Sequence, residues 1–188
     1  MELLRFDRKD IRNMGNKHGE TIAKIVGNLQ FEGYNVFSDH GTASEYVGKI
    51  VSTLEKDYSR KDELSQLDIA IVEKNSDKVV VLVEIEETSD RPKTILGDIF
   101  SVLLGEYICF KGKDLRIGDF TTLIVVGVYK TDHKERNQNI LDLANKAKAS
   151  LGTQNARIGK IVVETYRDTE ELSAWLPSLV ERAVKGEL

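Results

Sequence analysis

The chain of 188 residues has little cysteine, little proline and no long run of apolar residues. Its single cysteine, Cys109, cannot form an internal disulfide, and a zinc cluster built on cysteines is excluded. The N-terminal segment MELLRFDRKD is too charged for a secretory signal, and no apolar run approaches the roughly 18 residues that cross a bilayer. These absences predict a cytoplasmic protein without a membrane partner.

Phosphate-binding motifs and zinc motifs are also missing. GxxxxGK[ST] and GxGxxG do not occur, which disfavours a nucleotide-dependent enzyme. The histidines His18, His40 and His133 are too dispersed for a motif such as HExxH. His18 lies close to Glu20 on the same predicted helix and could border an acidic site, although an exposed helical histidine is the commoner interpretation. The net charge of −4 gives no positive argument for a nucleic-acid partner, but a local basic patch at 110–116 could still contact phosphates.

Hydrophobic periodicity predicts helices and strands in alternation within a single domain covering residues 1–188. The predicted helices are 17–32, 42–54, Pro92 to Ile108, 132–151, and one that opens at Asp168 or Thr169. The predicted strands are 34–37, 66–73, 78–87, 121–129 and 158–166. Strands that are apolar on both faces need helices on both sides. We therefore predict an α/β three-layer sandwich with a central mixed sheet of about five strands.

Two acids that lie two residues apart, Glu84 and Glu86, interrupt the end of an apolar strand in the stretch VVVLVEIEE at 79–87, which Glu87 closes. Because side chains on a strand alternate between its faces, Val80 should share a face with Glu84 and Glu86, while Val79 faces the other way. Pairing within the predicted hairpin can place Asp68 beside Glu84. Either these carboxylates converge, or the strand emerges into solvent at Glu84 and leaves an ordinary charged end.

Converging carboxylates at the edge of an apolar sheet repel one another and lose hydration, at a cost of several kcal/mol unless a positive charge compensates them. A divalent cation is the natural compensator. Mg²⁺ prefers carboxylate, carbonyl and water oxygens, and it usually keeps positions open for a substrate phosphate. The convergent alternative therefore predicts a Mg²⁺ site.

The order of these features resembles the core of the PD-(D/E)XK nuclease superfamily, which includes many restriction endonucleases and Holliday-junction resolvases. A helix with Glu20 comes first, then a hairpin with Asp68 and with Glu84, Ile85 and Glu86 at the end of its second strand, then an apolar helix and a strand. The similarity covers roughly residues 17–130. It implies a restriction-endonuclease-like fold.

The resemblance also implies roles for individual residues. Asp68 is similar to the motif aspartate, Glu84 to the first acid of the (D/E)XK element, and the Ile85 carbonyl to a backbone metal ligand. Glu20 is similar to the helix acid that helps to bind metal, although an exposed helix glutamate is an equally good interpretation.

The sequence departs from the family pattern at two positions. Leu67 stands where a proline often precedes the motif aspartate. Glu86 occupies the position of the motif lysine, as in some restriction enzymes of the superfamily. Lys93, at the start of the next helix, is a candidate to supply the missing positive charge at the phosphate, and Arg91 is a second candidate. A solvated lysine in the first turn of a helix is the commoner interpretation of Lys93.

The function implied is a Mg²⁺-dependent DNA endonuclease, with Mn²⁺ as a substitute metal, acting on double-stranded or branched DNA. A double-strand cut needs two sites and hence a homodimer. The alternative from another class is a nuclease-like domain that has lost catalysis and serves as a DNA-binding or protein-interaction module. A third possibility is an unrelated α/β protein, in which Asp68, Glu84 and Glu86 diverge in space.

Overall fold

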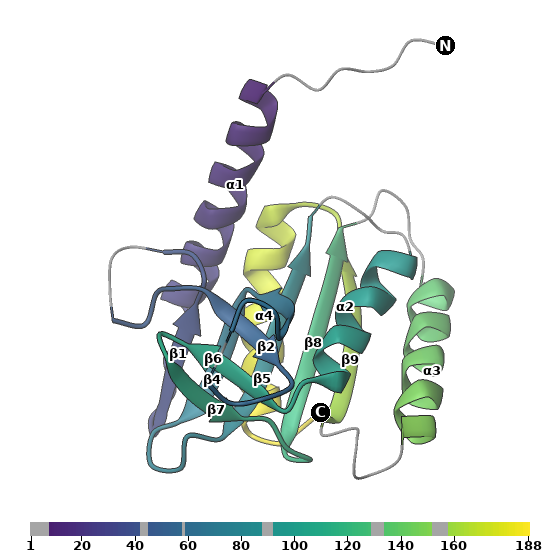
Figure 1. Ribbon diagram of the computed structural model, residues 1–188. Coiled ribbons are helices and arrows are strands. Elements are labelled where there is room, and N and C mark those ends of the chain that lie inside the picture. The colour runs from purple at the N-terminus through teal and green to yellow at the C-terminus, as the bar shows by residue number, and fades with distance from the viewer. Residues whose placement is uncertain (1–7, 42–44, 58, 88–91, 129–133, 152–157) are drawn as a thin grey trace.

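The computed structural model describes residues 8–41, 45–57, 59–87, 92–128, 134–151 and 158–188 (Figure 1). Four helices and two β-sheets make up this part of the chain, in an α/β arrangement. The larger sheet carries the candidate site, and the smaller one was not expected from the sequence.

The central sheet has five strands in the order β1-β4-β5-β8-β9. Its strands are β1 (Tyr34–Ser38), β4 (Ile69–Glu73), β5 (Val79–Glu86), β8 (Thr121–Val128) and β9 (Ile158–Tyr166). The pairs β1–β4 and β4–β5 are antiparallel, whereas β5–β8 and β8–β9 are parallel. The predicted mixed sheet of about five strands is confirmed, and β5 lies at its centre, between an antiparallel and a parallel neighbour.

Helices cover both faces of this sheet, as the apolar strands require. One face packs against α1 (Arg8–Gly27) and α4 (Thr169–Val184), and the other against α2 (Pro92–Leu104) and α3 (Lys134–Leu151). Pro92 is the first residue of α2, and Asp168 caps α4, as predicted. Within the described residues, no helix combines the length and the apolarity that crossing a membrane requires.

The second sheet lies on the α2 side of the central sheet, in the strand order β3-β2-β6-β7. Its strands are β2 (Ile50–Thr53), β3 (Glu63–Leu67), β6 (Tyr107–Phe110) and β7 (Lys113–Arg116). The predicted helix at 42–54 is therefore wrong where it overlaps β2. All four residues of β2 are buried, and a short segment buried on both faces has no periodicity that separates strand from helix.

The predicted helix from Pro92 to Ile108 is too long. The helix α2 ends at Leu104, and both Ile108 and Cys109 belong to β6. Gly105 follows the last helical residue and packs so closely on the second sheet that an added Cβ would collide with Ser52 Oγ. Cys109 is buried, as expected of a structural thiol.

The alternation predicted for β5 holds only for its second half. The register of β4 against β5 shifts so that Val72 pairs with Val79 and Ile71 with Val81, which leaves Val80 as an extra residue. Val79 consequently packs on the α2 side and Val80 on the α1 side, opposite to the prediction. Beyond this bulge strict alternation resumes and aims Glu84 toward the α2 side.

Candidate functional site: an acidic cluster at the end of the central hairpin

Asp68 lies at the entry to β4 and is only 5% exposed. Its backbone N–H donates to the Val83 carbonyl at 3.2 Å, one step beyond the Ile69–Val83 pair, so Asp68 stands opposite Glu84. Its Oδ2 accepts a hydrogen bond from the Ile85 N–H at 2.6 Å. The hairpin therefore places Asp68 beside the end of β5, as the sequence predicted.

Glu84 carries a carboxylate oxygen, Oε2, that is buried and has no hydrogen-bond partner among the described residues. Burial raises the pKa of Glu84 well above its usual range. The charges of Asp68, Asp98 and Asp39 raise this pKa further, while His18 lowers it. The site thus holds an acid whose ionised form is costly without a nearby cation.

Two further acids, Asp39 and Asp98, belong to the same cluster. Asp39 directly follows β1, and its N–H donates to the Asp68 carbonyl at 3.0 Å. Burial raises the pKa of Asp39 to about 7, and the charge of Asp68 contributes. Burial raises the pKa of Asp98, on α2, to about 6, with contributions from Glu86 and Asp68. One carboxylate oxygen of each acid is buried without a partner among the described residues.

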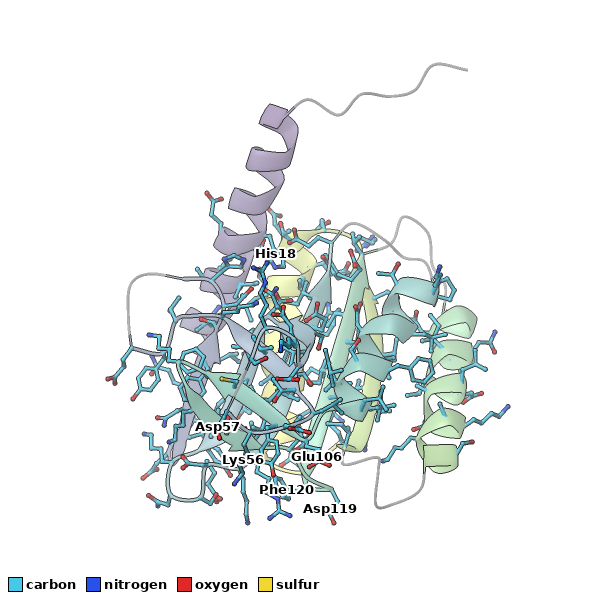
Figure 2. All side chains as sticks on the ribbon, in the orientation of Figure 1. His18, Lys56, Asp57, Glu106, Asp119 and Phe120 are labelled. Atoms are coloured by element: carbon cyan, nitrogen blue, oxygen red, sulfur yellow. The ribbon has the colours of Figure 1, made fainter. Side chains whose placement is uncertain are left out.

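His18, on α1, is the positive group at this cluster (Figure 2). Its Nε2 lies 3.0 Å from Asp68 Oδ1, and its Nδ1 lies 3.4 Å from Glu87 Oε2. The hydrogen bonds to Asp68 and to Glu87 raise the pKa of His18 to about 10, against the opposing effect of burial. A protonated His18 therefore compensates part of the negative charge at neutral pH.

The other predicted residues lie in different surroundings. Glu86 is half-buried, and its charge raises the pKa of Asp98, so it belongs to the same electrostatic neighbourhood. Glu20 is exposed and lines a hollow between α1 and the start of α4. Lys93 is exposed in the first turn of α2, and Arg91 lies outside the described residues.

Sequence reasoning missed Asp39, His40 and Asp98, and favoured an exposed position for His18. Two signals were present in the sequence. Asp39 lies just after a predicted strand, and Asp98 is the lone acid of an apolar helix. The contact made by His18 had no such signal, because it depends on how α1 packs across the sheet.

The carboxylate pair fits a hard cation. Asp68 and Glu84 supply anionic oxygens, and each carboxylate oxygen has two lone pairs, so the bonds that Asp68 accepts leave it able to bind a metal ion. The N–H and C=O of one strand residue point to the same side, so the Ile85 carbonyl faces Asp68 as its N–H does. The predicted ligands Asp68, Glu84 and Ile85 thus lie on one small patch.

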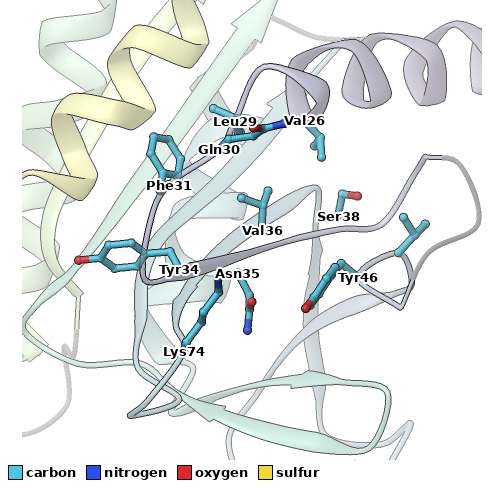
Figure 3. Close-up of a pocket in the computed structure, with 11 residues that line it drawn as sticks. Val26, Leu29, Gln30, Phe31, Tyr34, Asn35, Val36, Ser38, Tyr46 and Lys74 are labelled. Carbon is cyan, nitrogen blue, oxygen red and sulfur yellow. The ribbon is translucent and has the colours of Figure 1, made fainter.

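A separate hollow of about 430 Å³ runs along the edge strand β1 (Figure 3). It is lined by Val26, Leu29, Gln30, Phe31, Tyr34, Asn35, Val36, Ser38, Tyr46, Val47 and Lys74. No carboxylate stands among these residues, so the hollow offers no acidic ligands for a hard metal ion.

A scan against protein-family models, and searches of curated proteins and of solved structures, found no match to this chain. The class of molecule that the coordinates define is an α/β protein with an acidic site at the end of a central hairpin. Any more particular assignment depends on the chemistry of that site.

Proposed function

We propose that this protein is a Mg²⁺-dependent endonuclease that hydrolyses DNA phosphodiester bonds. The observation that carries the proposal is the pair Asp68 and Glu84, with a partnerless buried oxygen on Glu84, at the end of the β4–β5 hairpin. When the strands of the second sheet are left aside, the elements follow in the order α1, β1, β4, β5, α2, β8, which supports a restriction-endonuclease-like core. Acids that merely lie on a surface would be exposed, whereas Asp68 is buried.

Each residue of the site has a distinct task in this proposal. Asp68, Glu84 and the Ile85 carbonyl would hold Mg²⁺, and His18 fixes the orientation of the Asp68 carboxylate through its hydrogen bond. Bound Mg²⁺ supplies a water of lowered pKa and neutralises charge that develops on the phosphate. Glu86 accepts the proton of the attacking water. Lys93, from the exposed start of α2, stabilises the phosphate.

The same charges explain why a cation is needed before DNA can approach. Several carboxylates gathered at one place repel a phosphate, and bound Mg²⁺ reverses the sign of that interaction locally. Cutting both strands of a duplex requires two such sites, so we propose a homodimer as the active form. Double-stranded or branched DNA is the proposed substrate.

One observation favours the runner-up, a nuclease-like domain that binds DNA or protein without catalysis. His18 already compensates Asp68, and Glu86 stands where the family has a lysine, so the site could persist without metal. The basic patch at 110–116 offers this alternative little support. Lys113 is paired with Asp77 at 2.6 Å, and Lys111 donates to a backbone carbonyl of Glu45 at 2.9 Å.

The test is cleavage of supercoiled plasmid and of branched DNA by the purified protein, with Mg²⁺ or Mn²⁺ and with EDTA as the blank. Glu84→Gln and Asp68→Asn remove one anionic ligand each while conserving size. Glu187→Gln and Asp119→Asn are the matched controls, since both residues are exposed and Asp119 lies far from His18 in Figure 2.

We expect the wild type and the controls to cut, and both site variants to lose at least about a hundredfold in rate, because even outer-shell changes cost about 10- to 100-fold. Equal cutting by Glu84→Gln would indicate a contaminating nuclease or a different site. If folded wild-type protein cuts none of these DNAs with either metal, the non-catalytic binding module becomes the better assignment.

A further inference from the structure

A second group of ligands lies beside the acidic cluster and does not depend on Glu84. It consists of His18 from α1 and of Asp39 and His40, which directly follow β1. One ligand atom from each residue lies within 4.8 Å of the other two. We propose that His18, Asp39 and His40 form a second metal site, which binds a transition metal ion such as Zn²⁺ and discriminates against Mg²⁺.

The fold holds the three side chains together from two directions. On the strand side, the Asp39 N–H donates to the Asp68 carbonyl at 3.0 Å, and Ser38 Oγ donates to the His40 carbonyl at 2.8 Å. On the helix side, the His40 ring lies against Gly19, where an added Cβ would be 3.6 Å from the ring. The two imidazole rings meet edge to face, with their centroids 5.3 Å apart. The ligands are therefore positioned by backbone contacts as well as by their own side chains.

The hydrogen bond from His18 to Asp68 has the form expected of a metal-binding histidine. Such a histidine commonly donates one ring N–H to a carboxylate, which orients the ring and makes the other nitrogen a better ligand. In His18, Nε2 contacts Asp68 Oδ1 at 3.0 Å, so Nδ1 is the nitrogen that would bind a metal. Nδ1 lies 3.4 Å from Glu87 Oε2, so a metal ion has to displace the proton that joins these two groups.

The remaining two ligands have atoms ready for a cation. Asp39 Oδ1 is buried and has no hydrogen-bond partner among the described residues. His40 Nε2 lies 3.4 Å from Asp39 Oδ2, and the His40 side chain is 43% exposed, so its ring can move toward a metal ion without disturbing the core. Ligand atoms bound tetrahedrally at about 2.0–2.2 Å lie roughly 3.4 Å from one another, so the observed group, whose ligand atoms lie within 4.8 Å, has to contract by about an ångström.

The chemistry of the donors selects the ion. Two imidazole nitrogens and one carboxylate suit Zn²⁺, Co²⁺ or Ni²⁺, whereas Mg²⁺ prefers oxygen ligands alone. Three protein ligands leave at least one position of a tetrahedral ion for water or another small ligand. The chain would then bind two kinds of cation side by side, a hard one at Asp68 and Glu84 and a softer one at this site.

The experiment uses Co²⁺ alone as the probe, because its visible absorption reports nitrogen and oxygen ligands directly. The full-length protein is freed of metal, supplied with excess Mg²⁺ to occupy the carboxylate pair, and titrated with Co²⁺. Zn²⁺ is then added to displace it. The variants are His40→Gln and Asp39→Asn, with His133→Gln as the matched histidine control and Glu84→Gln to report on the neighbouring pair. Circular dichroism checks that each variant is folded.

We expect one Co²⁺ per chain in the presence of Mg²⁺, displaced by Zn²⁺, with the affinity reduced at least about tenfold in His40→Gln and in Asp39→Asn. His133→Gln should keep the wild-type affinity, and Glu84→Gln should lose less of it than His40→Gln does, because Glu84 acts on His18 and Asp39 through its charge and is not one of the three ligands. The proposal fails if folded wild type binds no Co²⁺, if His40→Gln binds it normally, or if only Glu84→Gln loses it. No readout requires DNA cleavage, so the metal site and the proposed nuclease activity are tested independently of each other.

Discussion

Asp39→Asn should stabilise the metal-free protein, which is an unusual expectation for a conservative change at a half-buried acid. The Asp39 side chain is 20% exposed, and burial together with the charge of Asp68 raises its pKa from 3.8 to about 7. A carboxyl with a raised pKa binds a proton more tightly in the folded protein than in the unfolded chain. It therefore destabilises the fold increasingly as the pH rises from about 4 to about 7.

The size of the effect follows from that pKa. Raising a pKa from 3.8 to about 7 corresponds to about 4 kcal/mol of lost stability above pH 7. Relaxation and water entry reduce such values, so we expect Asp39→Asn to gain about 2 kcal/mol at pH 8. Near pH 4 the wild-type carboxyl is protonated in the folded protein and the gain should nearly vanish. Asparagine keeps the size of the side chain and removes the charge.

The assay is urea unfolding in EDTA at a series of pH values from 4 to 8, comparing wild type with Asp39→Asn, and Asp119→Asn as the exposed control. The difference in free energy of unfolding should grow across this range and then level off, while the control stays flat. A variant less stable than wild type at pH 8, or a difference independent of pH, would refute the cost inferred for the buried charge of Asp39. Adding Zn²⁺ should reverse the order, since only the wild type keeps the full ligand set.

Three further outcomes are expected from unfolding measurements. His18→Gln should destabilise by about 1–3 kcal/mol below pH 6.5, because it leaves buried Asp68 without its cation, and the loss should fade as the pH rises through about 10. Thr121→Val removes a buried hydroxyl that donates to a β5 carbonyl at 2.6 Å and should cost about 1–3 kcal/mol at any pH. Gly159→Ala would place a Cβ against the Asp119 carbonyl oxygen. The variant should lose about 1–3 kcal/mol in free energy of unfolding and should melt at a lower temperature. A melting temperature equal to wild type for Gly159→Ala would contradict this close approach.

The elements that the sequence predicted best have simple local signals. The strand β9 begins and ends at Ile158 and Tyr166 as predicted, and the β4–β5 hairpin follows from alternation and its turn residues. The second sheet could not be predicted in this way. Its strand β2 pairs with β6, which lies far along the chain, and each has only four residues. Short buried strands are defined by their partners, which periodicity within one segment does not reveal.

The residues of the site likewise include some that local sequence predicts and some that only tertiary packing brings together. Asp68 and Glu84 are neighbours in one hairpin, so local register was enough to pair them. Residues 18 and 20 of α1 are two positions apart and thus project from different sides of the helix. The resemblance indicated Glu20, but the side of α1 that meets Asp68 carries His18, and Glu20 faces α4. Only the packing of α1 across the sheet decides which of the two reaches the acids.

The central position of β5 has a consequence for the order of events during synthesis. Its antiparallel partner β4 is made just before it, but its parallel partner β8 is made only after α2 and the strands β6 and β7. Until then the edge of β5 that pairs with β8 has no hydrogen-bond partner, and the layers that bury Glu84 in the folded protein are incomplete. The carboxylates of a nascent chain would therefore remain ordinary acids, and their raised pKa values would arise only when the second half of the chain buries them.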